Sequence, residues 1–356
     1  MNPAGNGVCD LCPRRCGVRR VRGETGYCRA GTGWYIASIC AHRGEEPAIS
    51  GTRGICNVFF AHCNLQCVYC QNYQISSNSA PLTLFETTLE ETVGRISSIL
   101  KTSEPLVGFV SASHCVPQIK SIISRLHDEG IRPAFLYNTN SYDRVDVLRG
   151  LEDEIDVYLP DFKYAGGELA AEYSGAGDYP ETAIQAIAEM VRQKGAELQF
   201  NEDGVVNSGV VVRHLVLPGA VENSKRCLRM LAERVSPDVH VSLMSQYTPV
   251  PRVSDHPLLG RRLRPEEYNE VVSELRALGF ENGWVQAMDS AGHFLPDFKS
   301  SGTGGNGRNP FGGELKAESG KQKAESGKRG EKPRITRICA NGEGNRESRA
   351  RRGGQR

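Results

Sequence analysis

The 356-residue sequence lacks any long apolar run, and this absence narrows the class of protein. No stretch reaches the ~18 apolar residues that a membrane-spanning helix needs. The first ten residues, MNPAGNGVCD, contain no apolar segment typical of a secretory signal. The formal net charge is also close to zero, at +1. The sequence therefore predicts a cytoplasmic protein that does not insert into a membrane.

Large apolar residues are scarce from Ser301 onward, where the chain repeats the unit KAESGK. This part has fourteen Lys or Arg and six Asp or Glu, so it carries +8, and residues 1–300 carry −7. It cannot bury enough surface to offset its chain entropy. Residues 301–356 are therefore predicted to form a basic, glycine-rich, disordered tail. Both binding to an anionic surface and an extension without a role fit such a composition.

Cysteine, in contrast, is abundant, with twelve in the chain. In the reducing cytoplasm, clustered thiols are more often metal ligands or catalytic groups than disulfides. Seven of them form two groups, one at residues 9–28 and one at residues 63–70. We divide the chain accordingly into a Cys-rich metal-binding segment (1–54), a core (55–300) and the tail (301–356).

The core alternates short β-branched or apolar runs with longer helical stretches, which is the pattern of parallel βα units. Six strands are predicted, at Asn57–Ala61, Leu106–Ser111, Pro133–Tyr137, Ile155–Leu159, Gly209–Leu217 and Val239–Met244. The helices that follow them are predicted at Thr88–Lys101, Val116–Glu129, Tyr142–Leu151, Pro180–Lys194, Ser224–Val235 and Pro265–Leu278. Six such units predict an α/β fold, an open (β/α)6 partial TIM barrel, with a doubly wound sheet as the alternative. In both, ligands bind at the C-terminal ends of the strands.

Cys63, Cys67 and Cys70 follow the first predicted strand, in the segment CNLQCVYCQNYQIS. Thiolates are ligands of iron-sulfur clusters and of zinc. Three ligands leave one metal position open for substrate, whereas structural sites usually have four. Cys56, Cys115 or His62 would close the site if one of them supplied a fourth ligand.

The spacing CxxxCxxC, with Tyr69 before its last cysteine, resembles the signature of the radical S-adenosylmethionine (SAM) superfamily. The stretches HRGEEPAISGTRG, YLPDFKY, VVRHLVLPG and SLMSQYTP extend the resemblance to uncharacterised proteins similar to pyruvate formate-lyase activating enzymes. It covers roughly Cys9 to Gly313. It implies a 4Fe-4S cluster on the three cysteines, with SAM bound at its open iron.

The resemblance also implies a reaction and partners. An electron from a donor such as flavodoxin or ferredoxin enters the cluster, and SAM is cleaved to a 5′-deoxyadenosyl radical that takes hydrogen from the substrate. In the activating enzymes the substrate is a glycyl-radical protein. Those enzymes carry Gly-Gly-Glu after the second strand, where this chain has Val110-Ser111-Ala112-Ser113-His114. Ser111 and Ser113 would then accept a hydrogen bond from the SAM ammonium group.

Five further side chains are candidate SAM contacts. Tyr69 would lie against the adenine or pack within its loop. Asp161 would accept from a ribose hydroxyl or a substrate amide, and Lys163 would offset the SAM carboxylate; a surface salt bridge between them is the alternative. Arg213 would bind a carboxylate, either that of SAM or that of Asp161. Asn138 would hydrogen-bond to SAM or serve as a turn residue.

Cys9, Cys12, Cys16 and Cys28 form the N-terminal group, in CDLCPRRCGVRRVRGETGYC. Four thiolates within twenty residues suffice for zinc or for a second iron-sulfur cluster. The interleaved arginines allow nucleic-acid binding, and a metal-stabilised lid on the barrel is the simpler interpretation. A non-catalytic iron-sulfur electron carrier and a nucleic-acid-binding protein are the functions that compete with a radical SAM enzyme.

Overall fold

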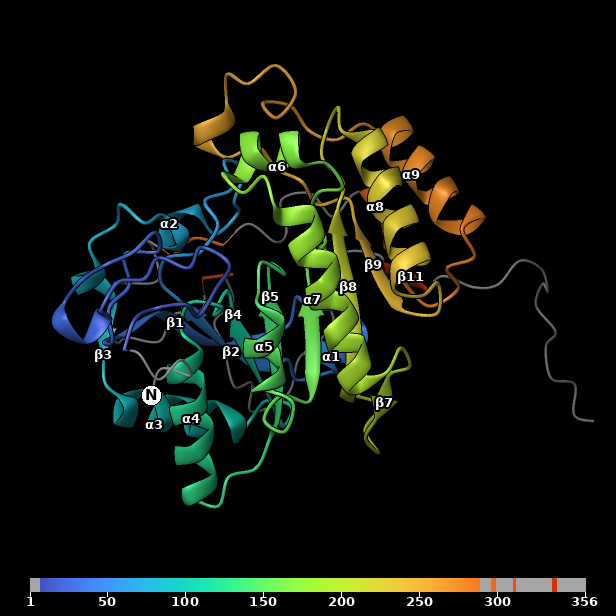
Figure 1. Ribbon diagram of the computed structural model, residues 1–356. Helices are drawn as coiled ribbons and strands as arrows, with labels where there is room; N and C mark the ends of the chain where they lie inside the picture. The colour runs from blue at the N-terminus through green and yellow to red at the C-terminus, as the bar shows by residue number, and fades with distance from the viewer. Residues whose placement is uncertain (1–6, 289–295, 299–309, 312–334, 338–356) are drawn as a thin grey trace, which may run out of the picture.

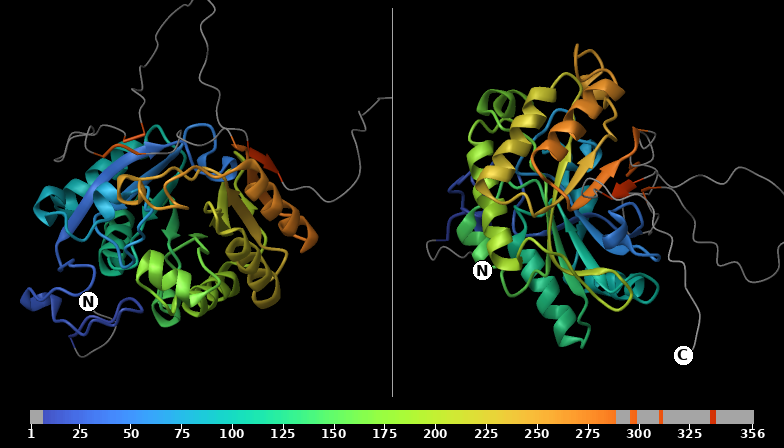
Figure 2. Two further views of the ribbon diagram at one scale, coloured as in Figure 1. Left: turned by 90° about the horizontal axis from the view of Figure 1, so that it is seen from above. Right: turned by 90° about the vertical axis from the view of Figure 1, so that its right-hand side faces the viewer.

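A curved sheet with helices along its outer face forms the centre of the structure (Figure 1). The structure is a computed structural model that describes residues 7–288, 296–298, 310–311 and 335–337. Figure 2 shows the curvature from above, with the helices outside and the concave face turned toward the loops of the C-terminal part. Within these residues the sheet does not close, because its order runs from β11 to β3 without a pairing between these two edges.

Seven strands of the sheet run parallel, in the order β2-β4-β5-β6-β8-β9-β10. Antiparallel strands extend both edges, and β7 pairs antiparallel with β8. The strands are β1 (Trp34–His42), β2 (Ile55–Phe60), β3 (Glu86–Thr87), β4 (Leu106–Val110), β5 (Ala134–Thr139), β6 (Val157–Pro160), β7 (Gln199–Phe200), β8 (Val206–Leu215), β9 (His240–Met244), β10 (Gly283–Gln286) and β11 (Ile335–Arg337).

The longer helices cover the outer face because each presents an apolar stripe to it. In α4, for example, Ile119, Ile122 and Leu126 recur at helical spacing and are buried. The helices are α1 (Pro47–Ser50), α2 (Tyr73–Ser76), α3 (Leu89–Leu100), α4 (Val116–Asp128), α5 (Val145–Arg149), α6 (Gly167–Ser174), α7 (Tyr179–Lys194), α8 (Val221–Arg234) and α9 (Pro265–Ala277). No helix in the described residues is both long and apolar enough to cross a membrane.

The mixed α/β class and the six predicted βα units are confirmed, within a large, mostly parallel, open sheet. Strands β1 and β10, which lie next to the two edge strands, and the short strands β3, β7 and β11 were not predicted. β1 lies within the segment 1–54 and pairs with β2, so part of that segment belongs to the sheet of the core. Of the predicted tail 301–356, only residues 310–311 and 335–337 are described, and the others lie outside the described residues.

Alternation along the strands determines which side chains reach the concave face. Val210 and Val212 of β8 join the outer core, whereas Val211 points inward, to a smaller cluster with Leu136 and Ile49. This inner cluster fills the barrel at the level of the middle of the strands. Side chains two residues further along the same strands lie above it, and they form the cavity described below.

Candidate functional site

Cys63, Cys67 and Cys70 lie in the loop between β2 and α2, at the C-terminal edge of the parallel strands. Cys63 is buried, and the other two cysteines are half-buried. Burial raises the pKa of Cys63 and of Cys70, and the neighbouring Cys67 raises both further. The three thiols are therefore close enough to interact, as the sequence predicts.

Each of the three sulfur atoms accepts hydrogen bonds. Ser76 Oγ donates to Cys70 Sγ at 3.2 Å, and Ser174 Oγ donates to Cys67 Sγ at 2.9 Å. Cys63 Sγ accepts from the Leu65 N–H and from Asn140 Nδ2, both at 3.4 Å. Donors directed at sulfur stabilise thiolates, which are the form that binds iron. This donor set therefore fits a 4Fe-4S cluster.

The three residues that would supply a fourth ligand contact other groups. The ring nitrogens of His62 lie 2.9 Å from the carbonyl oxygens of Cys28 and Ala80. Cys56 is fully buried within β2, and Cys115 interacts with Arg20 and Cys28. Among the described residues, no three His, Cys, Asp or Glu side chains are grouped to hold a single metal ion. A cluster requires a different arrangement, because each cysteine binds its own iron.

Lys163 and Asp161 lie next to this loop. Lys163 Nζ donates to Asp161 Oδ2 at 2.5 Å, and both side chains are largely buried. Burial lowers the pKa of Lys163, but Asp161 and the thiols of Cys67 and Cys70 raise it above its usual value. Lys163 is therefore a permanent cation beside two of the three thiols. Its pair with Asp161 is largely buried, whereas the alternative prediction was a salt bridge on the surface.

Tyr69 is buried and packs against other aromatic rings rather than facing open space. Its hydroxyl accepts from Tyr164 at 2.8 Å, and its ring makes edge contacts with Tyr164 and Tyr173. Tyr164 also lies 2.7 Å from the Ser174 hydroxyl that donates to Cys67. The aromatic residue of the signature thus holds the loop in place through its own packing.

Ser111 and Ser113 follow β4 and differ in their surroundings. Ser111 has a left-handed backbone (φ 57°), and its N–H donates to Asn138 O at 2.9 Å. Ser113 is buried and lies 3.3 Å from the Thr139 hydroxyl, with a further hydrogen bond to Asp143. The hydroxyl of Ser113 is therefore occupied by neighbours from the next strand.

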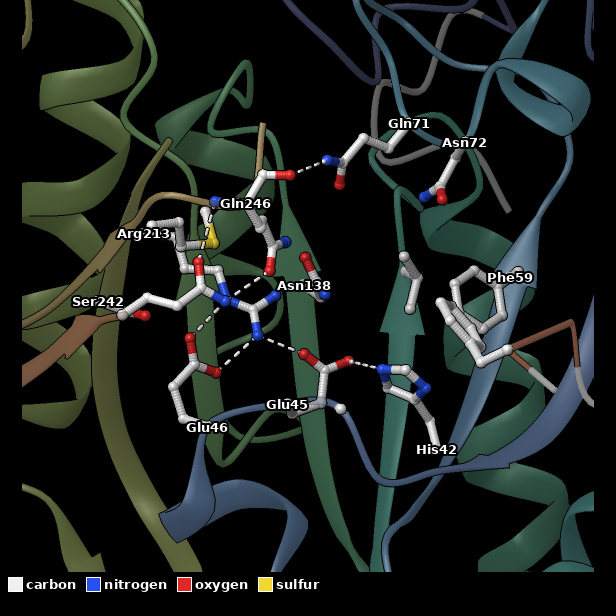
Figure 3. A pocket seen from close by; sticks show the side chains of 15 residues that line it. His42, Glu45, Glu46, Phe59, Gln71, Asn72, Asn138, Arg213, Ser242 and Gln246 are labelled. Carbon is white, nitrogen blue, oxygen red and sulfur yellow. Dashed lines mark hydrogen bonds and ion pairs between the residues drawn. The ribbon is translucent and has the colours of Figure 1, made fainter. Parts of the chain in front are cut away.

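A polar cavity of about 130 Å³ lies on the concave face beside the cysteine loop (Figure 3). Gln71 and Asn72, which directly follow Cys70, form one wall. The remaining lining comes from the loop after β1 and from the inward side of the strands: His42, Gly44, Glu45, Glu46, Phe59, Val110, Asn138, Arg213, Ser242, Met244, Gln246, Gln286 and Phe311. The cavity therefore joins the cysteine loop to the interior of the barrel.

Arg213 pairs with two glutamates at the base of this cavity and not with the carboxylate of Asp161, which was one of its two predicted partners. Its Nε and Nη2 donate to Glu46 at 2.9 and 2.6 Å, and Nη2 also donates to Glu45. Asp161 meets Arg213 only through the backbone, in an isolated parallel bridge. Glu45 and Glu46 were not among the predicted site residues, because adjacent acidic residues in a loop usually face solvent.

Asn57 holds Glu45 in place. Its Nδ2 donates to Glu45 Oε1 at 2.7 Å, and His42 Nε2 lies 3.7 Å from the same oxygen. Asn57 Oδ1 occupies the space above Gly108 of β4, where a Cβ atom would lie only 2.1 Å from it. Gly108 therefore makes room for the side chain that positions Glu45.

The N-terminal cysteines form a second group on the outside of the barrel. The Tyr27 N–H donates to Cys16 Sγ at 3.2 Å, and the N–H groups of Arg14 and Ala30 donate to Cys12 and Cys28. Burial raises the pKa of Cys12 to about 12, and the other cysteines of the group raise it too. The four thiols thus lie together, with backbone donors on three of the sulfur atoms.

Two arginines fasten this N-terminal group to the core. Arg14 donates from Nε to Asn64 O at 3.0 Å and from Nη1 to Gly175 O at 2.6 Å. Arg20 donates from Nη1 to His114 O at 2.8 Å and from Nη2 to Cys28 Sγ at 3.2 Å. Because both arginines are bonded to the core, their contacts favour the interpretation of this segment as a lid. They do not favour a nucleic-acid-binding surface formed by Arg14 and Arg20.

Comparison with known proteins places the chain near one relative. No family model matches it. It is 26% identical over 270 residues to the uncharacterized protein MJ0674 of Methanocaldococcus jannaschii, a match that covers 74% of this chain and 73% of that protein.

Among solved structures, SuiB of Streptococcus suis, determined with its precursor peptide SuiA, matches with a TM-score of 0.39 and 9% identity. That match covers 61% of this chain and 44% of SuiB, which is less than half of its length. A similarity of this size does not support an inference about function.

Proposed function

We propose that the chain is a radical SAM enzyme that binds a 4Fe-4S cluster through Cys63, Cys67 and Cys70. The observation that supports it best is the arrangement of the three thiols. They share one loop at the C-terminal edge of a parallel sheet, and each sulfur accepts a hydrogen bond. When SAM binds such a cluster it is cleaved reductively, and the resulting radical takes hydrogen from a substrate.

The chain's own residues would hold and shield this site. Ser76, Ser174 and Asn140 would stabilise the thiolates, and Lys163 would offset their negative charge. The aromatic packing around Tyr69 would exclude water from beneath the loop. Asn138 and Arg213 would contact SAM or substrate from the cavity, and Ser111 would do so through its hydroxyl.

We further propose that Cys9, Cys12, Cys16 and Cys28 bind zinc or a second iron-sulfur cluster. The support is that Cys12 interacts with the other three cysteines and that N–H groups donate to three of the sulfur atoms. The four thiols are not already arranged around a single ion in the described residues, so binding zinc would bring them closer together. Binding would release protons, because the raised pKa of Cys12 keeps its thiol protonated without a metal. Such a metal would stabilise a segment that has little apolar core of its own.

A glycyl-radical protein is the first substrate to test, with flavodoxin or ferredoxin as the electron donor. This part of the proposal depends on the sequence resemblance, and the Gly-Gly-Glu position differs in this chain. Other substrates of radical SAM chemistry form the alternative.

Anaerobic protein with a reconstituted cluster, given SAM and dithionite, should produce 5′-deoxyadenosine and methionine. Cys67→Ala should abolish both the cluster absorbance and the cleavage. Cys227→Ala is the matched control, because Cys227 is a buried cysteine of α8, outside the cysteine loop. Intact cluster absorbance without SAM cleavage would contradict the enzyme and favour an electron carrier.

A further inference from the structure

The cavity of Figure 3 contains three charged side chains that are almost completely withdrawn from solvent. The side chains of Glu45, Glu46 and Arg213 are 7%, 4% and 12% exposed. Burial of charge is costly unless it is paired, so this arrangement is a built feature of the fold. It lies beside Gln71 and Asn72, and therefore beside the loop that carries the three cysteines.

The charges in the cavity do not cancel. Two carboxylates face one guanidinium, which leaves one formal negative charge. Burial raises the pKa of Glu45, but the Arg213 guanidinium lowers it to about 2, so Glu45 is ionised at neutral pH. Burial lowers the pKa of His42, so its ring does not supply the missing positive charge. The other lining side chains are uncharged.

Three polar side chains in the lining, those of Ser242, Asn138 and Asn72, have no hydrogen-bond partner within the described part of the chain. Ser242 is 6% exposed, and its hydroxyl borders the cavity without a bond to any described group. The side-chain amides of Asn138, on β5, and of Asn72 are likewise unbonded in that part, and the Asn138 side chain is half-buried. Buried polar groups are normally hydrogen-bonded, so the buried Ser242 hydroxyl points to a polar ligand, which the amide of Asn138 would also contact.

An anionic ligand does not fit this lining. The Nε and Nη2 groups of Arg213 are taken by the two glutamates. Its Nη1 group has no partner among the described residues, but a carboxylate bound there would be repelled by both glutamates. A protonated amine would instead supply the missing positive charge. Its three N–H groups would be shared among carboxylate, hydroxyl and amide oxygens.

We propose that this cavity binds a protonated amine at Glu45 and Glu46, with Ser242 and Asn138 as additional hydrogen-bonding groups. The inference rests on the proposed radical SAM function and specifies one group of its ligands. Two molecules carry such an amine. One is SAM, for whose ammonium group this chain has no glutamate at the Gly-Gly-Glu position. The other is a substrate with an amino group.

The test uses full-length, cluster-reconstituted protein titrated anaerobically with n-butylammonium, n-butanol and butyrate at equal ionic strength, with binding followed by the shift in thermal unfolding. Only butylammonium should bind. Glu45→Gln should weaken its binding by about tenfold to a hundredfold, since a hydrogen bond to a charged group contributes roughly 1.5 to 3 kcal/mol. Glu104→Gln is the matched control, because Glu104 is a buried glutamate that pairs with Arg53 elsewhere.

The same titration at saturating SAM distinguishes the two sources of the amine. Competition between SAM and butylammonium assigns the cavity to the SAM ammonium, and simultaneous binding assigns it to a substrate amine. Equal binding of butyrate or butanol, or unchanged binding by Glu45→Gln, would overturn the proposal. If Glu45→Gln does not fold, Ser242→Ala and Asn138→Leu replace it, because they leave the ion pairs intact and should still weaken binding.

The amine titration and the SAM cleavage assay can succeed or fail independently, so the two proposals are tested separately. Glu45, Ser242 and Asn138 are not cysteine ligands, so the titration can be repeated on cluster-free protein. Amine binding without SAM cleavage would support the cavity and reject the radical SAM proposal. SAM cleavage without amine-selective binding would do the reverse.

Discussion

Arg14 Nε donates a hydrogen bond to the carbonyl oxygen of Asn64 at 3.0 Å, which joins the N-terminal cysteine segment to the loop between Cys63 and Cys67. The same guanidinium lies 3.8 Å from the centre of the Tyr27 ring and reaches the carbonyl of Ser174 at 3.3 Å. Ser174 in turn donates to Cys67. The two groups of cysteines are therefore mechanically connected through one side chain.

Replacing Arg14 with alanine should loosen the cysteine loop. We expect the free energy of unfolding to fall by roughly 1 to 3 kcal/mol, because several charge-assisted hydrogen bonds are lost. Iron should also leave the reconstituted protein faster in the presence of a chelator, which can be followed by absorbance. Arg22→Ala serves as the control, since Arg22 is exposed. Equal rates of iron loss in the two variants would contradict this connection.

Ser174→Ala should make the cluster harder to reduce. The serine hydroxyl stabilises the sulfur of Cys67, and removing a donor from a thiolate favours the oxidised cluster. A loss of about 1 kcal/mol corresponds to about 40 mV for one electron. A redox titration followed by electron paramagnetic resonance measures the midpoint potential. A potential equal to that of the unaltered protein would show that this bond does not tune the cluster.

Cys12→Ala should remove the N-terminal metal and leave the SAM-binding cluster in place. Metal analysis of purified protein gives the zinc and iron content, and visible absorbance reports the cluster on Cys63, Cys67 and Cys70. If the N-terminal site binds zinc, we expect the zinc content to decrease while the absorbance remains. If it binds a second iron-sulfur cluster, iron and absorbance should fall in part while SAM cleavage continues. Identical metal content before and after the change would mean that the N-terminal thiols bind no metal.

The two buried histidines His114 and His214 should make stability depend on pH. Burial lowers the pKa of each to about 4, so both stay neutral in the folded protein, whereas the unfolded chain binds a proton near pH 6.5. The free energy of unfolding should therefore decrease as pH falls from 6.5 to 4, by up to about 1.4 kcal/mol per pH unit for each histidine. Urea unfolding at pH 7 and pH 5 tests this, and His114→Gln should reduce the slope.

Gly108→Ala should disturb the cavity from beneath. The new methyl group would overlap Asn57 Oδ1, so we expect a loss of about 1 to 3 kcal/mol in unfolding free energy. Adding Asn57→Ala should restore part of this loss, because the overlap is then removed. Thermal unfolding of the single and double variants gives the comparison. Full stability of Gly108→Ala would refute the steric argument.

Much of the fold can be predicted from the sequence because its strands and helices have clear periodicity. The six parallel strands and their helices lie within a few residues of the predicted ranges. Strand β1, near the edge of the sheet, was not predicted. Its sequence, WYIASICAH, precedes the first βα unit and has no turn signal that identifies its partner. Pairing at the edge of a sheet depends on contacts between distant residues, which a local pattern does not encode.

The candidate site, like the fold, was predicted only where residues close together in the sequence determine it. The spacing of Cys63, Cys67 and Cys70 is local, so the sequence brings them together correctly. The partners of Arg213 lie 167 and 168 residues away, and no local pattern points to them. Alternation along β8 predicts that Arg213 and His214 face opposite sides, but it does not show what Arg213 meets.

The position of β1 and the loop after it affects how this chain should be divided for experiments. A fragment starting at residue 55 would retain all six βα units and all three cysteines of the signature. It would lack the strand that covers one edge of β2 and both glutamates that face Arg213. Such a fragment would expose a sheet edge to other chains and leave a buried arginine without its counter-charges. A fragment made for experiments should therefore include β1 and the loop after it, although both precede the six βα units.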